Sequence, residues 1–120
     1  MLERNRAEAI ATEWLDAWNA HRPDLVVAHF ADDVVVASPL AAQLRPGSGG
    51  VLRGKDEVLA YYVDGLAAVG DLRFTLVETL VGVDQITIVY RNHREVLAAE
   101  TLTLRNDGLV GAVSVAYGEP

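Results

Sequence analysis

The sequence predicts an α+β domain in which three N-terminal helices pack on a strongly curved, mostly antiparallel sheet. Two observations predict it. Apolar residues recur at helical spacing before residue 70, apart from one β-branched run at 34–37. From Asp71 onward apolar and polar residues alternate, with turn residues at 82–84, 94–95 and 106–108. The expected order is helix, helix, strand, helix and four strands, in a single domain over residues 1–120.

The first helix is expected over residues 3–20, with one apolar face formed by Ala7, Ile10, Ala11, Trp14, Ala17 and Trp18. Pro23 suits the first turn of a short second helix over 23–30, with Phe30 as its core anchor. The third helix is expected to start after Gly54 and to end at Gly70. Its expected buried residues are Val58, Leu59, Tyr62, Val63 and Leu66.

Asp32 and Asp33 are expected to end the second helix before a strand at 34–37. Residues 39–53 contain two prolines and three glycines, which indicates a long loop, either a functional lid or a disordered surface loop. The later strands are expected over 72–81, 86–93, 96–104 and 109–117, and the first of them shows its apolar face as Leu72, Phe74, Leu76 and Leu80.

Three helices can cover only one face of such a sheet, and a strongly curved sheet leaves a cavity at its open end. The uncovered face then meets water or a second subunit. Val77, Val81 and Val89 make that face partly apolar, which favours a homodimer.

The net charge of −7 disfavours nucleic acid and membrane surfaces as partners. Cysteine is absent and the three histidines form no close ligand pair, so neither a metal site nor another cofactor is expected. Charged residues from position 3 onward are untypical of a signal peptide, and a cytoplasmic location is expected.

Three strings carry a resemblance: WLDAWNAHRPDLVVAHFADDVVVASP, LRGKDEVLAYY and LTLRNDGLVGAVSVAYGE. They resemble the nuclear transport factor 2-like superfamily, in particular its SnoaL-like and ketosteroid isomerase-like branch. The resemblance implies a cystatin-like cone with an internal pocket for a small molecule. It leaves the function open, because the superfamily includes isomerases, cyclases, dehydratases, hydrolases and non-catalytic binding domains.

The ketosteroid isomerases use an aspartate base at the end of the first strand, a tyrosine on the first helix and a protonated acid on the penultimate strand. The matching positions here are Ser38, Trp14 and Glu100. A serine hydroxyl does not accept a proton from a carbon acid without a second base, so steroid isomerase activity is not expected. Ser38 either binds a ligand or satisfies the local backbone, and Trp14 is either core or pocket wall.

Glu100 is the expected catalytic residue, since it shares its strand face with Ala98, Leu102 and Leu104. If that face is buried, desolvation raises the pKa of Glu100 and keeps the carboxyl protonated. The alternative is a glutamate on the open face, paired with Arg91 or Arg94.

The turn at 94–95 decides the neighbours of this carboxyl. A two-residue turn places Val89 opposite Glu100 and allows an Arg91–Glu100 pair. A three-residue turn places Ile88 opposite Glu100 and Tyr90 opposite Ala98, which would make an apolar pocket with Tyr90 at its edge. The sequence leaves both open.

The remaining expected pocket residues are Trp18, Tyr62, Val113 and Tyr117. His29 and His93 are interpreted as surface or capping residues, and Glu78 as an exposed edge residue. Two functions remain open: acid–base chemistry of the isomerase, cyclase or dehydratase kind on an apolar or oxygenated small molecule, or a non-catalytic ligand-binding or dimerisation domain.

Overall fold

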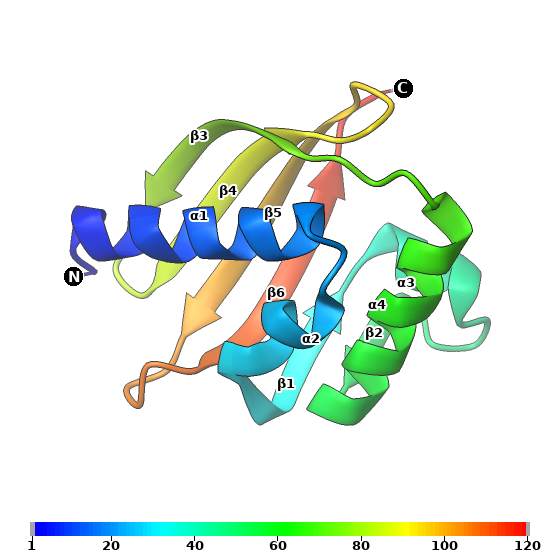
Figure 1. The fold of residues 1–120 in the computed structure, drawn as a ribbon. Helices are drawn as coiled ribbons and strands as arrows, with labels where there is room; N and C mark the ends of the chain where they lie inside the picture. Colours follow the sequence, from blue (N-terminus) through cyan, green and yellow to red (C-terminus); the bar gives the residue numbers. More distant parts are fainter. Residues whose placement is uncertain (1, 120) are drawn as a thin grey trace.

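A computed structural model describes residues 2–119 (Figure 1). The helices are α1 (Arg4–Asn19), α2 (Pro23–Val26), the single 3₁₀ turn η1 (Val27–His29), α3 (Pro39–Leu44) and α4 (Lys55–Val69). The strands are β1 (Phe30–Ala37), β2 (Val51–Arg53), β3 (Thr75–Val81), β4 (Gln85–Arg91), β5 (Leu97–Leu104) and β6 (Val110–Tyr117). The predicted α+β class is confirmed.

The six strands form one sheet in the order β2-β1-β6-β5-β4-β3. All neighbours are antiparallel except β1 and β6, which run parallel. Figure 1 shows α1 crossing β3, β4 and β5, while α4 lies beside β1 and β2. The helices thus cover one face of a curled sheet, as predicted, and none of the described helices is long and apolar enough to cross a membrane.

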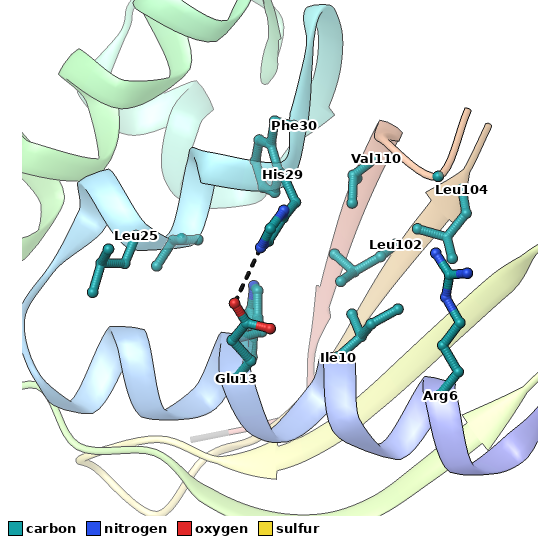
Figure 2. Close-up of a pocket in the computed structure, with 12 residues that line it drawn as sticks. Arg6, Ile10, Glu13, Leu25, His29, Phe30, Leu102, Leu104 and Val110 are labelled. Atoms are coloured by element: carbon teal, nitrogen blue, oxygen red, sulfur yellow. Dashed lines mark hydrogen bonds and ion pairs between the residues drawn. The ribbon is translucent and has the colours of Figure 1, made fainter. Parts of the chain in front are cut away.

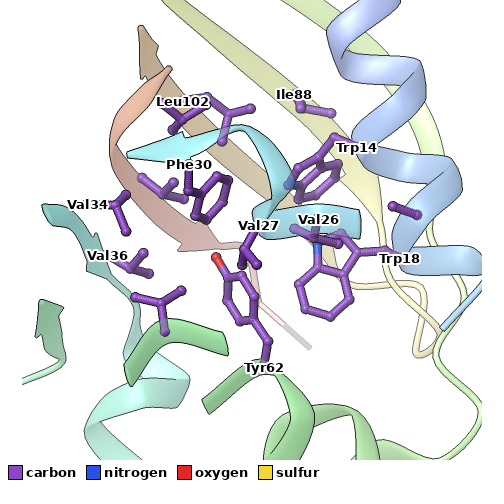
Figure 3. Packing of buried hydrophobic residues seen from close by; sticks show 14 of the residues in the cluster. Trp14, Trp18, Val26, Val27, Phe30, Val34, Val36, Tyr62, Ile88 and Leu102 are labelled. Carbon is purple, nitrogen blue, oxygen red and sulfur yellow. The ribbon is translucent and has the colours of Figure 1, made fainter. Parts of the chain in front are cut away.

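The core lies between the helices and this covered face. Figure 3 shows Trp14 and Trp18 from α1 meeting Tyr62 from α4 and Phe30 at the start of β1. The Trp18 and Tyr62 rings meet edge to face with their centroids 4.8 Å apart, a geometry that aromatic pairs prefer. The predicted core anchor Phe30 is indeed buried.

The prediction of a long loop over 39–53 is wrong. Pro39 occupies the first turn of α3, where its missing N–H costs nothing, and the following alanines suit a helix. Gly50 has a φ of 82° and turns the chain into β2. That strand pairs with β1, Leu52 opposite Val36, so the segment extends the sheet.

The prediction that Asp32 and Asp33 separate helix from strand is also wrong, because both lie inside β1. The second helix ends at His29 as a 3₁₀ turn. The pairing of β1 with β6 is irregular between Phe30 and Val35, which leaves both aspartates exposed. Asp33 then accepts a hydrogen bond from the Arg105 guanidinium at 2.7 Å.

Two of the predicted apolar faces, on β3 and on α4, differ from the faces that are buried in the structure. On β3 the pairing shifts between Leu76 and Glu78, a β-bulge after which Thr79 is buried and Leu80 is exposed, while Leu76 keeps its place opposite Tyr90 and is 41% exposed. On α4 Tyr61 is buried, whereas Val63 is 48% exposed.

The chain adopts the three-residue turn at 93–95. Asn92 N–H donates to the Val96 carbonyl, and Glu95 takes a φ of 62° within the turn. Ile88 therefore lies opposite Glu100 and Tyr90 opposite Ala98. This register contradicts the alternative in which Val89 faces Glu100 and Arg91 pairs with it.

Candidate functional site: a buried glutamate in an aromatic cavity

Glu100 is central on β5, between β4 and β6, with Ile88 and Val115 as its cross-strand neighbours. Its side chain points to the helix-covered face, as Ala98 and Leu102 do, and the residue is only 5% exposed. The buried alternative is the one observed. Ala98, Glu100 and Leu102 are two positions apart along the strand, so their side chains share one face, and that face is buried.

One side chain contacts this carboxyl through a hydrogen bond: the Tyr90 hydroxyl donates to Glu100 Oε1 at 2.9 Å. Burial raises the pKa of Glu100 from 4.5 to about 7, and the hydrogen bond from Tyr90 partly offsets the rise. At neutral pH the carboxyl therefore exists in both forms, which is the condition under which a group can donate and accept protons at similar rates.

Ser38 is buried at the end of β1, directly before α3. Its hydroxyl lies 3.2 Å from the hydroxyl of Tyr61, which α4 supplies. Burial raises the pKa of Tyr61, so both groups are neutral hydrogen-bonding hydroxyls at physiological pH. The predicted position of the isomerase base is thus occupied by a hydroxyl that hydrogen-bonds to Tyr61 and is no base by itself.

Around the carboxyl lies the Glu100 cavity, with a volume of about 70 Å³. Its polar lining consists of Ser38, Tyr61, Tyr62, Tyr90, Glu100 and Tyr117. Its apolar lining includes Trp18, Val36, Leu40, Leu66, Leu72 and Phe74.

The cavity continues into an outer groove of about 660 Å³, with which it shares Leu40, Tyr90 and Tyr117. The outer groove adds Asn92, His93 and the α3 residue Gln43. Cavity and groove together have room for a molecule whose inner end is small and whose remainder lies outside.

Only some of the other predicted pocket residues line the Glu100 cavity. Trp18 and Tyr62 line the cavity, and the Tyr62 hydroxyl is buried without a partner among the described residues, directed toward Phe30 and Val27 (Figure 3). Tyr117 is half-exposed where cavity and groove meet. Val113 is buried in the core and does not line the cavity.

Trp14 is buried and does not line the Glu100 cavity. Its ring contacts that of Tyr90, with centroids 5.4 Å apart, so it backs the tyrosine that holds Glu100. His29 is an exposed partner of Glu13, and Glu78 is exposed on the edge strand β3. His93 is half-buried in the outer groove.

Sequence reasoning missed Tyr61 as the partner of Ser38. The Tyr61-Tyr62 pair on one helix was the available signal, since adjacent positions on a helix point about 100° apart and a cavity wall can use both. Among residues 2–119 there is no cluster of histidine and carboxylate side chains that could hold a metal ion.

A family model described as the SnoaL-like domain matches residues 11–110. The chain belongs to the SnoaL-like family. A search of curated proteins found no match.

Solved structures show the same architecture. A SnoaL-like protein of unknown function from Burkholderia thailandensis is 36% identical, with a TM-score of 0.92 over 99% of this chain and 100% of that one. A candidate ketosteroid isomerase from Kribbella flavida is 18% identical, with a TM-score of 0.75 over 97% of this chain and 80% of that one. A candidate polyketide cyclase from Sinorhizobium meliloti is 18% identical, with a TM-score of 0.72 over 90% and 94%. The last two likenesses show the fold alone.

Proposed function

We propose that the Glu100 cavity binds a small apolar or oxygenated molecule and that Glu100 transfers a proton during an isomerisation, cyclisation or dehydration. One observation carries this proposal: a 5% exposed carboxyl in an aromatic cavity, with a pKa raised by burial to about 7. A structural role alone gives little reason to keep an ionisable group there, because burying a charge is costly.

The hydroxyl groups of the cavity can take separate roles. Tyr90 holds one carboxyl oxygen of Glu100, which leaves the other oxygen to exchange a proton with the bound molecule. Ser38 and Tyr61 form a neutral pair that can bind a carbonyl or hydroxyl oxygen of the ligand. Trp18 supplies an apolar wall for its carbon skeleton.

Steroid isomerase activity is outside the proposal. Ser38 stands where those enzymes carry their base, and no second carboxylate lines the cavity among the described residues. Glu100 must therefore remove and return the proton itself. The names of the structural neighbours, a ketosteroid isomerase and a polyketide cyclase, are compatible with such chemistry on a carbonyl compound.

Hydrogen–deuterium exchange on a small ketone tests the proposal. Cyclohexanone is incubated with the protein in D₂O, and loss of its α-proton signal is followed by NMR. Wild type should exchange the α-protons faster than buffer, Glu100→Gln should not, and Glu78→Gln, which changes an exposed carboxylate, should match wild type. Equal rates for wild type and Glu100→Gln would overturn the catalytic role of Glu100.

A second candidate is a non-catalytic binding domain, favoured by the absence of a second acid or base from the described cavity lining. It predicts that cyclohexanone shifts the backbone amide signals of Tyr61 and Glu100 without any exchange above buffer. Binding with no exchange would select this candidate.

We also propose that the chain forms a homodimer through its open sheet face. Val77 and Leu80 of the edge strand β3 support this, at 53% and 49% exposed, whereas Val81, predicted on the same face, pairs with the buried Ile86 and packs against the core. Light scattering at micromolar concentration should give twice the chain mass, and a monomer there would contradict it.

A further inference from the structure

A second pocket lies between the first half of α1, the α2–η1 segment and the β5–β6 hairpin (Figure 2). We call it the Trp14 pocket. Its volume is about 180 Å³, and it shares no lining residue with the Glu100 cavity. An apolar cavity of about 150 Å³ in another protein binds benzene, so the Trp14 pocket has room for one ring with a small substituent.

The walls of the Trp14 pocket are apolar and its polar groups are few. Ile10, Phe30 and Leu102 form the middle of the wall in Figure 2. Arg6 extends from α1 toward Leu104 on one side of them. On the other side His29 Nε2 lies 3.1 Å from Glu13 Oε1, so these two side chains are engaged with each other.

Arg6 has a different status. Among the described residues it forms no ion pair, which is also true of Arg53, Lys55, Arg73, Arg91 and Arg94 but not of Arg4, Arg22, Arg45 and Arg105. The guanidinium lies against the hairpin turn, because a Cβ added at Gly108 would stand 3.2 Å from Arg6 Nη2. A cation held against the rim of an apolar pocket, in a protein of net charge −7, suits an anionic group on the ligand.

Trp14 supplies the second observation. The residue is 5% exposed, and its indole Nε1 is buried with no hydrogen-bond partner among the described residues. Figure 3 shows this nitrogen on the ring edge that faces Phe30, another residue of the pocket. Leaving a buried donor unpaired costs free energy, and a ligand oxygen that accepts from it recovers that cost.

We propose that the Trp14 pocket is a binding site for a monocyclic aromatic carboxylate that carries an oxygen substituent on its ring. The ring packs on Ile10, Phe30 and Leu102, and Arg6 pairs with the carboxylate. The ring oxygen accepts the Trp14 N–H. This site is independent of the chemistry at Glu100.

Backbone amide NMR titrations with benzoate, 4-hydroxybenzoate, 3-hydroxybenzoate and neutral benzyl alcohol test the proposal. Benzoate should shift the Gly108 and Val110 signals, and at least one hydroxybenzoate should bind threefold or more tightly than benzoate. Arg6→Gln should weaken all three acids about tenfold and leave benzyl alcohol unchanged. Trp14→Phe, with its fold checked by circular dichroism, should remove only the advantage of the hydroxyl.

Two controls locate the effect. Arg105→Gln changes an exposed arginine of the same hairpin and should leave benzoate binding unchanged. Glu100→Gln should also leave it unchanged, which separates this site from the Glu100 cavity. Equal affinity for benzoate in wild type and Arg6→Gln, shifts confined to the Glu100 cavity, or no binding at about 20 mM benzoate would each overturn the proposal.

Discussion

The two pockets treat their carboxylates differently. Glu100 is enclosed by aromatic rings, and among residues 2–119 its carboxyl is hydrogen-bonded only by the Tyr90 hydroxyl. Glu13, at the rim of the Trp14 pocket, is exposed and paired with His29. Burial of the Glu100 carboxyl favours a change of its protonation near neutral pH. The exposed Glu13–His29 pair can instead attract or orient a ligand at the rim of its pocket.

Trp14 connects the two regions. Its ring stacks on Phe74, with centroids 5.8 Å apart, and contacts Tyr90, both of which line the Glu100 cavity. The same residue lines the second pocket. One large side chain thus supports the tyrosine behind the buried acid and forms a wall on the other side. Four predictions test this difference between the Glu100 cavity and the Trp14 pocket.

Trp14→Ala should have the largest effect. Removing a buried indole leaves a void and takes away the support of Tyr90, so the free energy of unfolding should fall by about 3–5 kcal/mol. Urea denaturation followed by circular dichroism measures the loss. A loss below about 1 kcal/mol would contradict the role of the Trp14 ring as the support of Tyr90.

The stability should depend on pH through Glu100. The pKa of its carboxyl is about 7 in the folded chain, against a reference value of 4.5. Between these values the unfolded chain releases the proton while the folded chain keeps it, so the free energy of unfolding falls as pH rises from about 4.5 to 7. The expected fall is about 3 kcal/mol, from 1.4 kcal/mol per pKa unit.

Glu100→Gln should remove this fall, because the amide does not titrate. Glu78→Gln is the matched control, an exposed glutamate on β3, and should keep the wild-type profile. Denaturation at several pH values compares the three proteins. A Glu100→Gln profile as steep as that of wild type would assign the pH dependence to other groups.

Tyr90→Phe should have a smaller effect. The variant keeps the ring and removes the hydrogen bond to Glu100 Oε1, which should lower the free energy of unfolding by about 1 kcal/mol. Because that bond lowers the pKa of Glu100, the pKa should rise in the variant. Carboxyl NMR titration measures the shift, and an unchanged or lower pKa would contradict the role of Tyr90.

Glu13→Gln should have the smallest effect. The Glu13–His29 pair is exposed, so its loss should change the free energy of unfolding by less than about 1 kcal/mol. Urea denaturation at pH 7 checks this value. A loss as large as that of Trp14→Ala would show that the rim of the second pocket is part of the core.

The sequence predicted well where the pattern is long and regular. The α1 face from Ala7 to Trp18 and the Glu100 face of β5 both follow uninterrupted periods, and both are buried as expected, apart from the half-buried Ile10. It failed on β3, because a bulge is set by pairing with β4 and leaves no local signal. It also failed on 39–53, where the glycines and prolines that suggest a loop flank a short helix and a strand that depends on β1.

For the same reason the sequence predicted only part of the candidate site. Glu100 stands out within its own strand, but its partner Tyr90 depended on a turn whose two lengths the sequence left open. Tyr61 meets Ser38 only because α4 packs beside β1. Contacts between distant elements depend on packing, which periodicity within one element does not report.

The pKa of Glu100 tests the central claim most directly. Selective ¹³C labelling of glutamate side chains, with Glu100→Gln to assign the signal, allows its carboxyl carbon to be titrated by NMR in the folded protein. The account predicts a midpoint near pH 7, well above the reference value of 4.5 for a glutamate. A midpoint at about 4.5 would show that water reaches the carboxyl and would contradict its role as a proton-transferring group at neutral pH.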